Sequence, residues 1–389
     1  MTTTPNTRPT DHSHTDRSHT DHAPVTDIET VIIGAGQAGL ATGHFLAERG
    51  HETMILDAES RVGDNWRRQW DSLRLYTPAQ YDGLPGLPFP AARWSFPGKD
   101  DVGDYLELYA HEFDLPVQLN TRVQRLSREG GHTVDRFVIS TDRGMFRANN
   151  VVVATGTFGR TPNIPACAAD LDPVILQLHS SEYRRPGQLR DGSVLVVGAS
   201  HSGADIAYEV AQTHPTILAG RDCGQIPPRL DAPIMHVMFP AILFAWRHVL
   251  NRNTPIGRKE MADIRFHGGP APRVKRADLA ERGVERVTAR VEEVVGGLPV
   301  VDGAPREVGT VVWATGFRQV FDWIDLPVFD EHGWPREMRG VADDVPGLFF
   351  CGLSFQFSFA SMLLPGVGRD AALVADRVLE RSAGLLVAA

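Results

Sequence analysis

The 389-residue chain is long enough for two domains with separate cores, and its 42% hydrophobic and 22% charged residues are ordinary for a soluble globular protein. A net charge of −9 argues against nucleic acid as a partner, because phosphate binding needs a basic surface. The three cysteines, Cys167, Cys223 and Cys351, are far apart, which excludes a disulfide framework and most zinc sites and fits a cytoplasmic protein. The first residues are polar and have no apolar core, so we expect no secretory signal.

Residues 1–26 form a polar tail in which TDHSH, TDRSH and TDHAP repeat every five residues. The tail has almost no apolar side chains to offset the entropy of ordering, so we expect it to be disordered. An alternative is that its histidines hold a transition metal loosely beside the aspartates. These histidines are His12, His14, His19 and His22. We predict no metal site.

A first glycine motif, GAGQAG, follows a short apolar run that predicts a buried strand. Gly34 permits a tight turn, Gly36 lets the backbone approach a pyrophosphate, and Gly39 allows close packing of helix on strand. Gln37 lies inside the motif, where the helix amino terminus offers N–H groups to phosphate. Asp57, after the second strand, suits ribose hydroxyls, so this unit predicts an FAD site rather than an ordinary glycine-rich turn.

A second unit, VLVVGASHSGAD, has Gly198, Ser200 and Gly203 at the three turn positions. The spacing to the residue after the second strand is 23 in both units (57 − 34 and 221 − 198). Arg221 stands at that place here, and an arginine suits a 2′-phosphate whereas a carboxylate would repel it. This unit therefore predicts an NADPH site, with a solvated Arg221 as the alternative.

Two strand-like segments, VVVATGTFGR and VVWATGFRQ, end in Ala-Thr-Gly and bracket the second unit. We expect the chain to leave the FAD domain after the first segment and to return at the second, which places Thr315 and Gly316 near a cofactor. The predicted fold class is α/β, with an NADPH domain inserted into a discontinuous FAD domain, both Rossmann-like. The expected domain boundaries are 27–163 and 306–389 for FAD and 164–305 for NADPH.

The most apolar run extends from Pro233 to Leu250 and is interrupted by Pro240 and by charged residues. It is short for a membrane span. We expect a buried or pocket-lining helix broken near Pro240 and no integral membrane segment, with peripheral membrane contact as the alternative.

Taken together and in order, several motifs resemble the class B flavin-dependent monooxygenases, which include flavin-containing, Baeyer–Villiger and YUCCA-type enzymes. The resemblance covers residues 29–375 and is closest to compact bacterial CzcO-like flavoproteins. It rests on GAGQAG, GDNWRRQWDSLRLYTP, HSSEYRRP, GASHSG, WATGF and GLFFCGLSFQFSFASMLLPGVGRDA. It implies that NADPH reduces FAD, that the reduced flavin forms a C4a-hydroperoxide with dioxygen, and that a small organic substrate is then oxygenated.

The family fingerprint, F-x-G-x-x-x-H-x-x-x-[FYW], is matched only in its second half. His179 and Tyr183 fit the pattern, whereas Pro173 and Ile175 replace its phenylalanine and glycine. Tyr183 is typical of the N- and S-oxygenating or YUCCA-like branch, which favours those reactions, or oxidative decarboxylation of a 2-oxo acid, over Baeyer–Villiger oxidation. The resemblance makes His179 a candidate for a hinge that couples the two domains, with a plain turn as the alternative.

The matching motifs also imply contacts with flavin. They assign Trp66 and Arg67 after the ribose-binding acid, Gln80 in the TPAQY segment, and Gly352 before the last helix, which we expect to begin near Pro365. The amino terminus of that helix would direct a positive dipole at the flavin. Core packing is the alternative for the aromatic residues.

The remaining hypotheses on function differ in which molecule accepts the electrons from the reduced flavin. A cysteine pair is missing at both places where disulfide reductases carry one, which excludes a disulfide acceptor and leaves dioxygen or a diffusible oxidant. The alternatives to a monooxygenase are an NAD(P)H-flavin oxidase or quinone reductase, and a metal-linked flavoprotein.

Loops in 226–270 are expected to line the substrate pocket. The expected partners are a small-molecule substrate and dioxygen, and a homodimer is compatible with the sequence.

Overall fold

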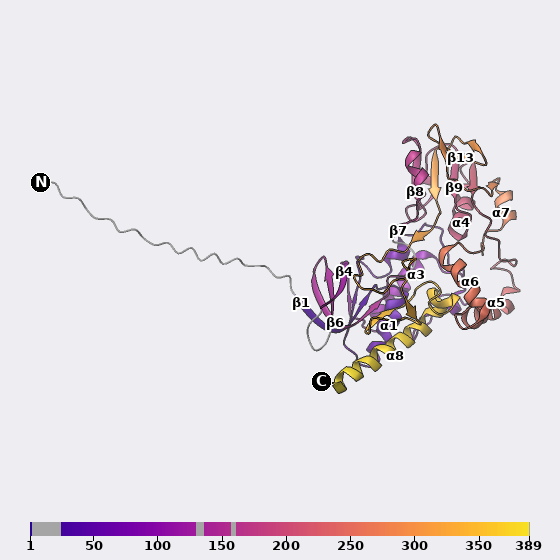
Figure 1. The fold of residues 1–389 in the computed structure, drawn as a ribbon. Helices are drawn as coiled ribbons and strands as arrows, with labels where there is room; N and C mark the ends of the chain where they lie inside the picture. Colours follow the sequence, from indigo (N-terminus) through magenta and orange to yellow (C-terminus); the bar gives the residue numbers. More distant parts are fainter. Residues whose placement is uncertain (2–24, 130–135, 157–160, 389) are drawn as a thin grey trace.

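The computed structural model describes residues 1, 25–129, 136–156 and 161–388. They form two lobes, each built around a parallel sheet with helices packed against it (Figure 1), so the predicted α/β class with two Rossmann-like units is confirmed. The histidine-rich part of the tail and residues 157–160 of the first Ala-Thr-Gly segment lie outside the described residues. The first strand begins at Val25, earlier than the expected start at Asp27, because Val25 and Thr26 already pair with β6.

Within the described residues, the first sheet has nine strands in the order β17-β18-β19-β6-β1-β2-β3, with β5 pairing with β6 and β4 with β5. All neighbours from β19 to β3 are parallel. The strands are β1 (Val25–Ile33), β2 (Thr53–Leu56), β3 (Val117–Gln118), β4 (Val123–Glu129), β5 (Arg136–Thr141), β6 (Gly144–Val153), β17 (Glu337–Met338), β18 (Val341–Ala342) and β19 (Leu348–Phe350).

The central strands of this sheet are apolar on both faces. Ile32 and Val152 pack into a cluster with helices α1 (Gln37–Ala47), α3 (Lys99–Glu112) and α8 (Leu364–Ala388). Val31 and Val151 point the other way, into a second cluster with β4 and β5. Parallel strands covered on both faces read as continuous hydrophobic runs, which is why the sequence shows VII and VVV here. Figure 1 shows α8 alongside α1.

The second sheet has five parallel strands among the described residues, in the order β11-β10-β9-β15-β8. Val196 and Val312 face α4 (His201–Val210) and α7 (Arg276–Glu281), whereas Leu195 and Val311 face the opposite side. The strands are β8 (Leu176–His179), β9 (Val194–Val197), β10 (Thr216–Ala219), β11 (Glu285–Val287) and β15 (Thr310–Trp313). The three-stranded antiparallel sheet comprises β12 (Val294–Val295), β13 (Leu298–Val301) and β14 (Ala304–Pro305).

The chain returns to the first sheet later than residue 306, the expected boundary. Strand β15 pairs with β8 and β9, so it completes the second sheet before the chain crosses back. The two crossings then run side by side, because β7 (Thr161–Pro162) and β16 (Phe317–Arg318) form an antiparallel pair between the lobes. The sequence pattern does not show which sheet β15 joins, because an apolar strand before Ala-Thr-Gly has the same pattern in either sheet.

The expected break at Pro240 is wrong. Helix α5 (Met235–Phe244) continues through Pro240 and widens into a π-helical turn at Ala245–Val249. Only one face of α5 is buried, and Val237 and Phe244 are exposed. Within the described ranges, no helix is long and apolar enough to span a bilayer. The remaining helices are α2 (Asp64–Arg67), α6 (Pro255–Phe266), and the short 3-10 turns Ala79–Tyr81, Ala166–Asp170, Pro186–Gln188 and Phe359–Met362.

Candidate functional site

The first glycine turn gives each glycine a separate task. Gly34 has a φ of +112°, and a Cβ there would lie 2.7 Å from the carbonyl oxygen of Ala154. A Cβ on Gly39 would lie 1.8 Å from the carbonyl oxygen of Gly34, so α1 can approach β1 this closely only without a side chain. At Gly36 a Cβ would meet no described atom within 4 Å. This open space at the amino terminus of α1 leaves room for a pyrophosphate.

Asp57 fixes this turn from the neighbouring strand. It is buried directly after β2, and its Oδ2 accepts a hydrogen bond from the Ala35 N–H at 2.5 Å. Its Oδ1 accepts from the Glu59 N–H at 2.8 Å. Each carboxylate oxygen has a second lone pair, so a ribose hydroxyl can still donate to Asp57.

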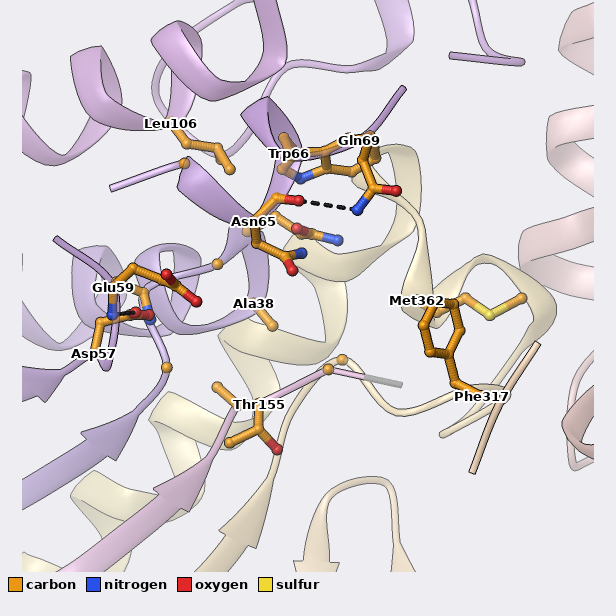
Figure 2. Close-up of a pocket in the computed structure, with 18 of the residues that line it drawn as sticks. Ala38, Asp57, Glu59, Asn65, Trp66, Gln69, Leu106, Thr155, Phe317 and Met362 are labelled. Atoms are coloured by element: carbon orange, nitrogen blue, oxygen red, sulfur yellow. Dashed lines mark hydrogen bonds between the residues drawn. The ribbon is translucent and has the colours of Figure 1, made fainter. Parts of the chain in front are cut away.

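A cavity of about 340 Å³ opens beside the turn and extends toward the second lobe (Figure 2). The indole of Trp70 lines it, and its buried Nε1–H has no hydrogen-bond partner among the described residues. Predicted residues that line the cavity are Gly34, Gly36, Gln37, Asp57, Trp66 and Gly352. The first lobe thus supplies an open phosphate cradle and an acid along one cavity.

Two predicted flavin residues point elsewhere. Arg67 donates to the Val62 carbonyl at 2.7 Å and to Asp104 at 2.9 Å, so it holds α2 against α3 and does not line this cavity. The Gln80 Oε1 accepts from Arg93 at 3.1 Å, also outside the lining.

The second glycine turn repeats the first with two differences. A Cβ on Gly203 would lie 1.7 Å from the Gly198 carbonyl oxygen, so helix and strand again approach closely. Ser200, however, donates its hydroxyl to the Gly269 carbonyl at 2.9 Å, which ties a loop across the turn. In the sheet register, Val197 pairs with Ala219 and Gly220 follows, so the exposed Arg221 stands one residue beyond the position equivalent to Asp57.

Each Ala-Thr-Gly segment packs against its own glycine turn. A Cβ on Gly198 would lie 2.3 Å from the Ala314 carbonyl oxygen, as Gly34 does toward Ala154. Thr155 and Gly156, which we did not predict as site residues, line the cavity. Thr315 and Gly316 occupy the equivalent place at the second turn and do not line it. The internal repeat was the signal that could have identified the first pair.

The linker residue His179 is buried at the end of β8 and contacts the returning crossing. Its Nε2 lies 3.0 Å from the Gly316 carbonyl oxygen, its Nδ1 lies 2.8 Å from the Ser181 hydroxyl, and its ring contacts Phe317 edge-on at 4.9 Å. Burial lowers the pKa of His179, which favours the neutral ring. The hydroxyl of Tyr183 donates to Glu209 on α4 at 2.7 Å.

At the end of the cavity, residues from both lobes meet. Tyr76 comes from the first lobe, Phe317 from the returning crossing, and His201 and Ser202 from the first turn of α4. Phe317 and Met362 are labelled in Figure 2. Sequence reasoning missed these residues, although the GASHSG turn itself carried His201.

The comparisons with known proteins agree with this architecture. A protein-family model described as "Pyridine nucleotide-disulphide oxidoreductase" matches residues 31–222, which contain both glycine turns. An "Uncharacterized oxidoreductase CzcO-like" from Geobacillus kaustophilus is 36% identical over 354 residues, covering 90% of this chain and 98% of that protein. The chain belongs to the CzcO-like oxidoreductases of the flavin monooxygenase family.

Solved structures support the same family. A flavin-containing monooxygenase from Stenotrophomonas maltophilia has a TM-score of 0.68 and 27% identity, covering 92% of this chain and 99% of that chain. OTEMO in complex with FAD and NADP has a TM-score of 0.66 over 92% of this chain and 86% of that chain, and its 16% identity shows the fold alone. The protein is therefore a flavin-dependent oxidoreductase, as the sequence predicted.

Disulfide chemistry, named in the family model's description, does not fit the cysteines of this oxidoreductase. Cys167, Cys223 and Cys351 are all free thiols. Cys351 is fully buried, and burial raises its pKa to about 12, so it is a poor nucleophile. Nor do the described residues hold a group of three or more His, Cys, Asp or Glu side chains suited to a metal ion.

Proposed function

We propose that this oxidoreductase is an NADPH-dependent FAD monooxygenase that oxygenates a small organic substrate. The observation that supports it best is the single cavity that runs from the Gly36 turn to His201 and Ser202, at the start of the second glycine-turn helix. A cavity shared in this way allows two dinucleotides to meet with their reactive ends together.

The first lobe fits FAD. Gly36 and the amino terminus of α1 would hold the pyrophosphate, and Asp57 the ribose. When bound, FAD would supply two-electron chemistry, taking a hydride from NADPH and passing the electrons to dioxygen. One oxygen atom enters the substrate and the other leaves as water, with NADPH and one proton consumed.

In the second lobe, the turn of Gly198, Ser200 and Gly203 would hold NADPH, and the exposed Arg221 would pair with its 2′-phosphate. Gly198 and Gly203 keep the strand and helix in close contact, as at the first turn. The Ser200–Gly269 hydrogen bond must open or shift for a phosphate to reach the serine, so the loop at Gly268–Gly269 would move as NADPH enters.

The protein's own contribution to oxygenation is to position the two cofactors and to exclude water. The buried contacts of His179 with Gly316 and Phe317 brace the crossing that lines the end of the cavity. N- or S-oxygenation, or oxidative decarboxylation of a 2-oxo acid, is the expected reaction, on the Tyr183 match of the fingerprint.

The decisive experiment supplies the purified protein with NADPH, ¹⁸O-labelled dioxygen and a panel of thioethers, tertiary amines and 2-oxo acids. Incorporation of one labelled atom into a product supports monooxygenation. NADPH consumption that yields only labelled hydrogen peroxide, or that proceeds without oxygen when a quinone is added, would instead identify an oxidase or a quinone reductase.

A further inference from the structure

A buried carboxylate connects the two lobes at the end of the cavity. Asp205 lies on α4 of the second lobe, and its side chain is only 4% exposed. Its Oδ2 accepts a hydrogen bond from the hydroxyl of Tyr76, a first-lobe residue, at 2.9 Å. The same oxygen accepts from the Arg273 guanidinium, which forms an ion pair with Asp205.

Aromatic contacts connect the cluster of Tyr76, Asp205 and Arg273 to the cavity wall. The Tyr76 ring lies 5.4 Å from the His201 ring, and the Arg273 guanidinium lies over Tyr76 at 5.6 Å from its centroid. Tyr76 and His201 both line the cavity, whereas Asp205 lies behind them. The Tyr76 side chain is therefore the connection between a buried charge on α4 and the space where the two cofactors would meet.

The orientation of His201 is fixed from a second side. Its Nε2 lies 3.0 Å from the Pro270 carbonyl oxygen, and a carbonyl only accepts, so Nε2 carries the proton. Burial lowers the pKa of this histidine, which favours a neutral ring with Nδ1 as a hydrogen-bond acceptor. His201 begins α4, so any shift of Asp205 on this helix moves His201 with it.

Stability alone is a weak reason for this cluster. Burying an ion pair costs desolvation that its attraction barely repays, and apolar replacements are often neutral or stabilising. A buried pair does fix one geometry, because its partners have no alternative in the interior. Here Tyr76 adds a first-lobe hydrogen bond to the buried Asp205–Arg273 pair, so the geometry that the three side chains fix together is the position of α4 relative to the first lobe.

We propose that Tyr76 and Asp205 are positioning residues for hydride transfer, which hold His201 and the start of α4 at the distance from the FAD cavity that brings the nicotinamide over the flavin. The inference rests on the proposed NADPH-dependent function. It predicts that the cluster affects how the nicotinamide is placed and leaves the retention of either cofactor largely intact.

The test is Tyr76→Phe, which keeps the ring and its contacts with His201 and Arg273 and removes only the hydroxyl. We expect the FAD content to be unchanged and the Kd for NADP⁺ to stay within about twofold. We expect the rate of anaerobic flavin reduction by NADPH to fall about tenfold, which corresponds to about 1.4 kcal/mol. The change in the flavin visible spectrum on adding NADP⁺, a readout independent of turnover, should shrink.

The matched control is Tyr208→Phe on the same helix. The Tyr208 hydroxyl accepts a hydrogen bond from Arg282 at 3.3 Å, and the Arg282 guanidinium lies over the Tyr208 ring. Tyr208 does not line the cavity. This variant should match the unsubstituted protein in reduction rate and spectrum. Equal losses in Tyr208→Phe and Tyr76→Phe would overturn the proposal in favour of general destabilisation of α4.

Asp205→Asn provides a second variant, because the amide oxygen can still accept from Tyr76 while the charge that orients Arg273 is lost. It should slow reduction with FAD retained. Unchanged reduction and an unchanged NADP⁺ spectrum in both Tyr76→Phe and Asp205→Asn would overturn the positioning role. If NADPH fails to reduce the unsubstituted, FAD-bound protein, the proposed function itself fails and this inference with it.

Discussion

Gly36 differs from the other glycines of the first turn in what surrounds it. Gly34 and Gly39 press against backbone, whereas Gly36 has a φ of −79° that any residue can adopt and open space where a Cβ would go. The chain by itself would therefore tolerate a side chain at Gly36. The need for glycine there arises only when a pyrophosphate occupies the space.

Gly36→Val should fold normally and release FAD. A valine side chain against the pyrophosphate costs about 3 kcal/mol, which lowers affinity about a hundredfold. Flavin absorbance per protein and the thermal unfolding midpoint of the apoprotein are the measurements. Gly187→Val is the matched control, since Gly187 also has open space and lies outside the cavity. A Gly36→Val protein that purifies fully yellow would refute the FAD assignment.

Arg221 should decide the preference for NADPH over NADH. A charge-assisted hydrogen bond to a phosphate is worth about 1.5–3 kcal/mol, so Arg221→Ala should weaken NADPH binding by about tenfold or more. NADH lacks the 2′-phosphate and serves as the internal control, with its Kd nearly unchanged. Titration of the flavin spectrum with both nucleotides gives the two constants, and equal losses would mean that another residue selects the cofactor.

Asp82 should make stability depend on pH. Burial raises its pKa to about 7, while the hydrogen bond from Thr77 opposes the shift. Between its ordinary pKa of 3.8 and about 7 the folded state holds a proton that the unfolded chain releases, so this stabilisation is complete at low pH and is lost as pH rises through 7.

Replacing Asp82 with asparagine removes that titration. Denaturant unfolding at pH 4 and pH 8 should show the unsubstituted protein losing about 2–4 kcal/mol relative to Asp82→Asn over this range, since one pKa unit is worth about 1.4 kcal/mol. A constant difference between the two proteins at both pH values would show that Asp82 stays ionised in the fold.

At the scale of elements, the linker after β8 and the crossing β16 form one connected piece. The Gly316 carbonyl oxygen accepts a hydrogen bond from the Asn163 N–H at 2.9 Å and lies within hydrogen-bonding distance of the His179 Nε2. Both crossings between the lobes are thus fixed to the end of β8. A substitution at His179 should therefore change the position of Phe317 in the cavity wall.

His179→Ala should damage coupling more than flavin reduction. The two glycine turns are untouched, so NADPH should still reduce FAD at a rate within about twofold. A loosened crossing would admit water to the cavity, so product should fall while hydrogen peroxide rises. The ratio of peroxide formed to NADPH consumed measures this, with His214→Ala, in the turn that follows α4, as the control. Unchanged coupling would show that the linker is only a crossover.

At the scale of the whole molecule, every strand that the structure describes lies after Pro24. The first strand starts at Val25, and the described side chains that form or pack against the core clusters of the first lobe begin at Ile28. Deleting residues 1–24 should therefore leave FAD content, thermal midpoint and NADPH oxidation unchanged. A flavin spectrum or activity that responds to divalent metal in the full chain and not in the truncated one would contradict this and support a metal-linked flavoprotein.

Much of the architecture was predictable because it depends on local sequence. Buried parallel strands need continuous apolar runs, which can be recognised in the sequence. The turns can be recognised as well, because the close contacts there admit only glycine, at Gly34, Gly39, Gly198 and Gly203. The α/β class and the two dinucleotide units followed from these patterns, whereas the membership of the flavin monooxygenase family was predicted from the resemblance of several longer motifs taken together.

Tertiary structure decided what local patterns leave open. Strand β15 joined the second sheet because its neighbours are set by pairing across the chain, and α5 ran through Pro240 because packing of its buried face outweighed a lost hydrogen bond. Arg67 turned toward Asp104 and away from the cavity, while Tyr76 and Asp205, 129 residues apart, met at its end. Residue type and spacing determine which groups are available, but only the long-range packing of two lobes determines which of them share a cavity.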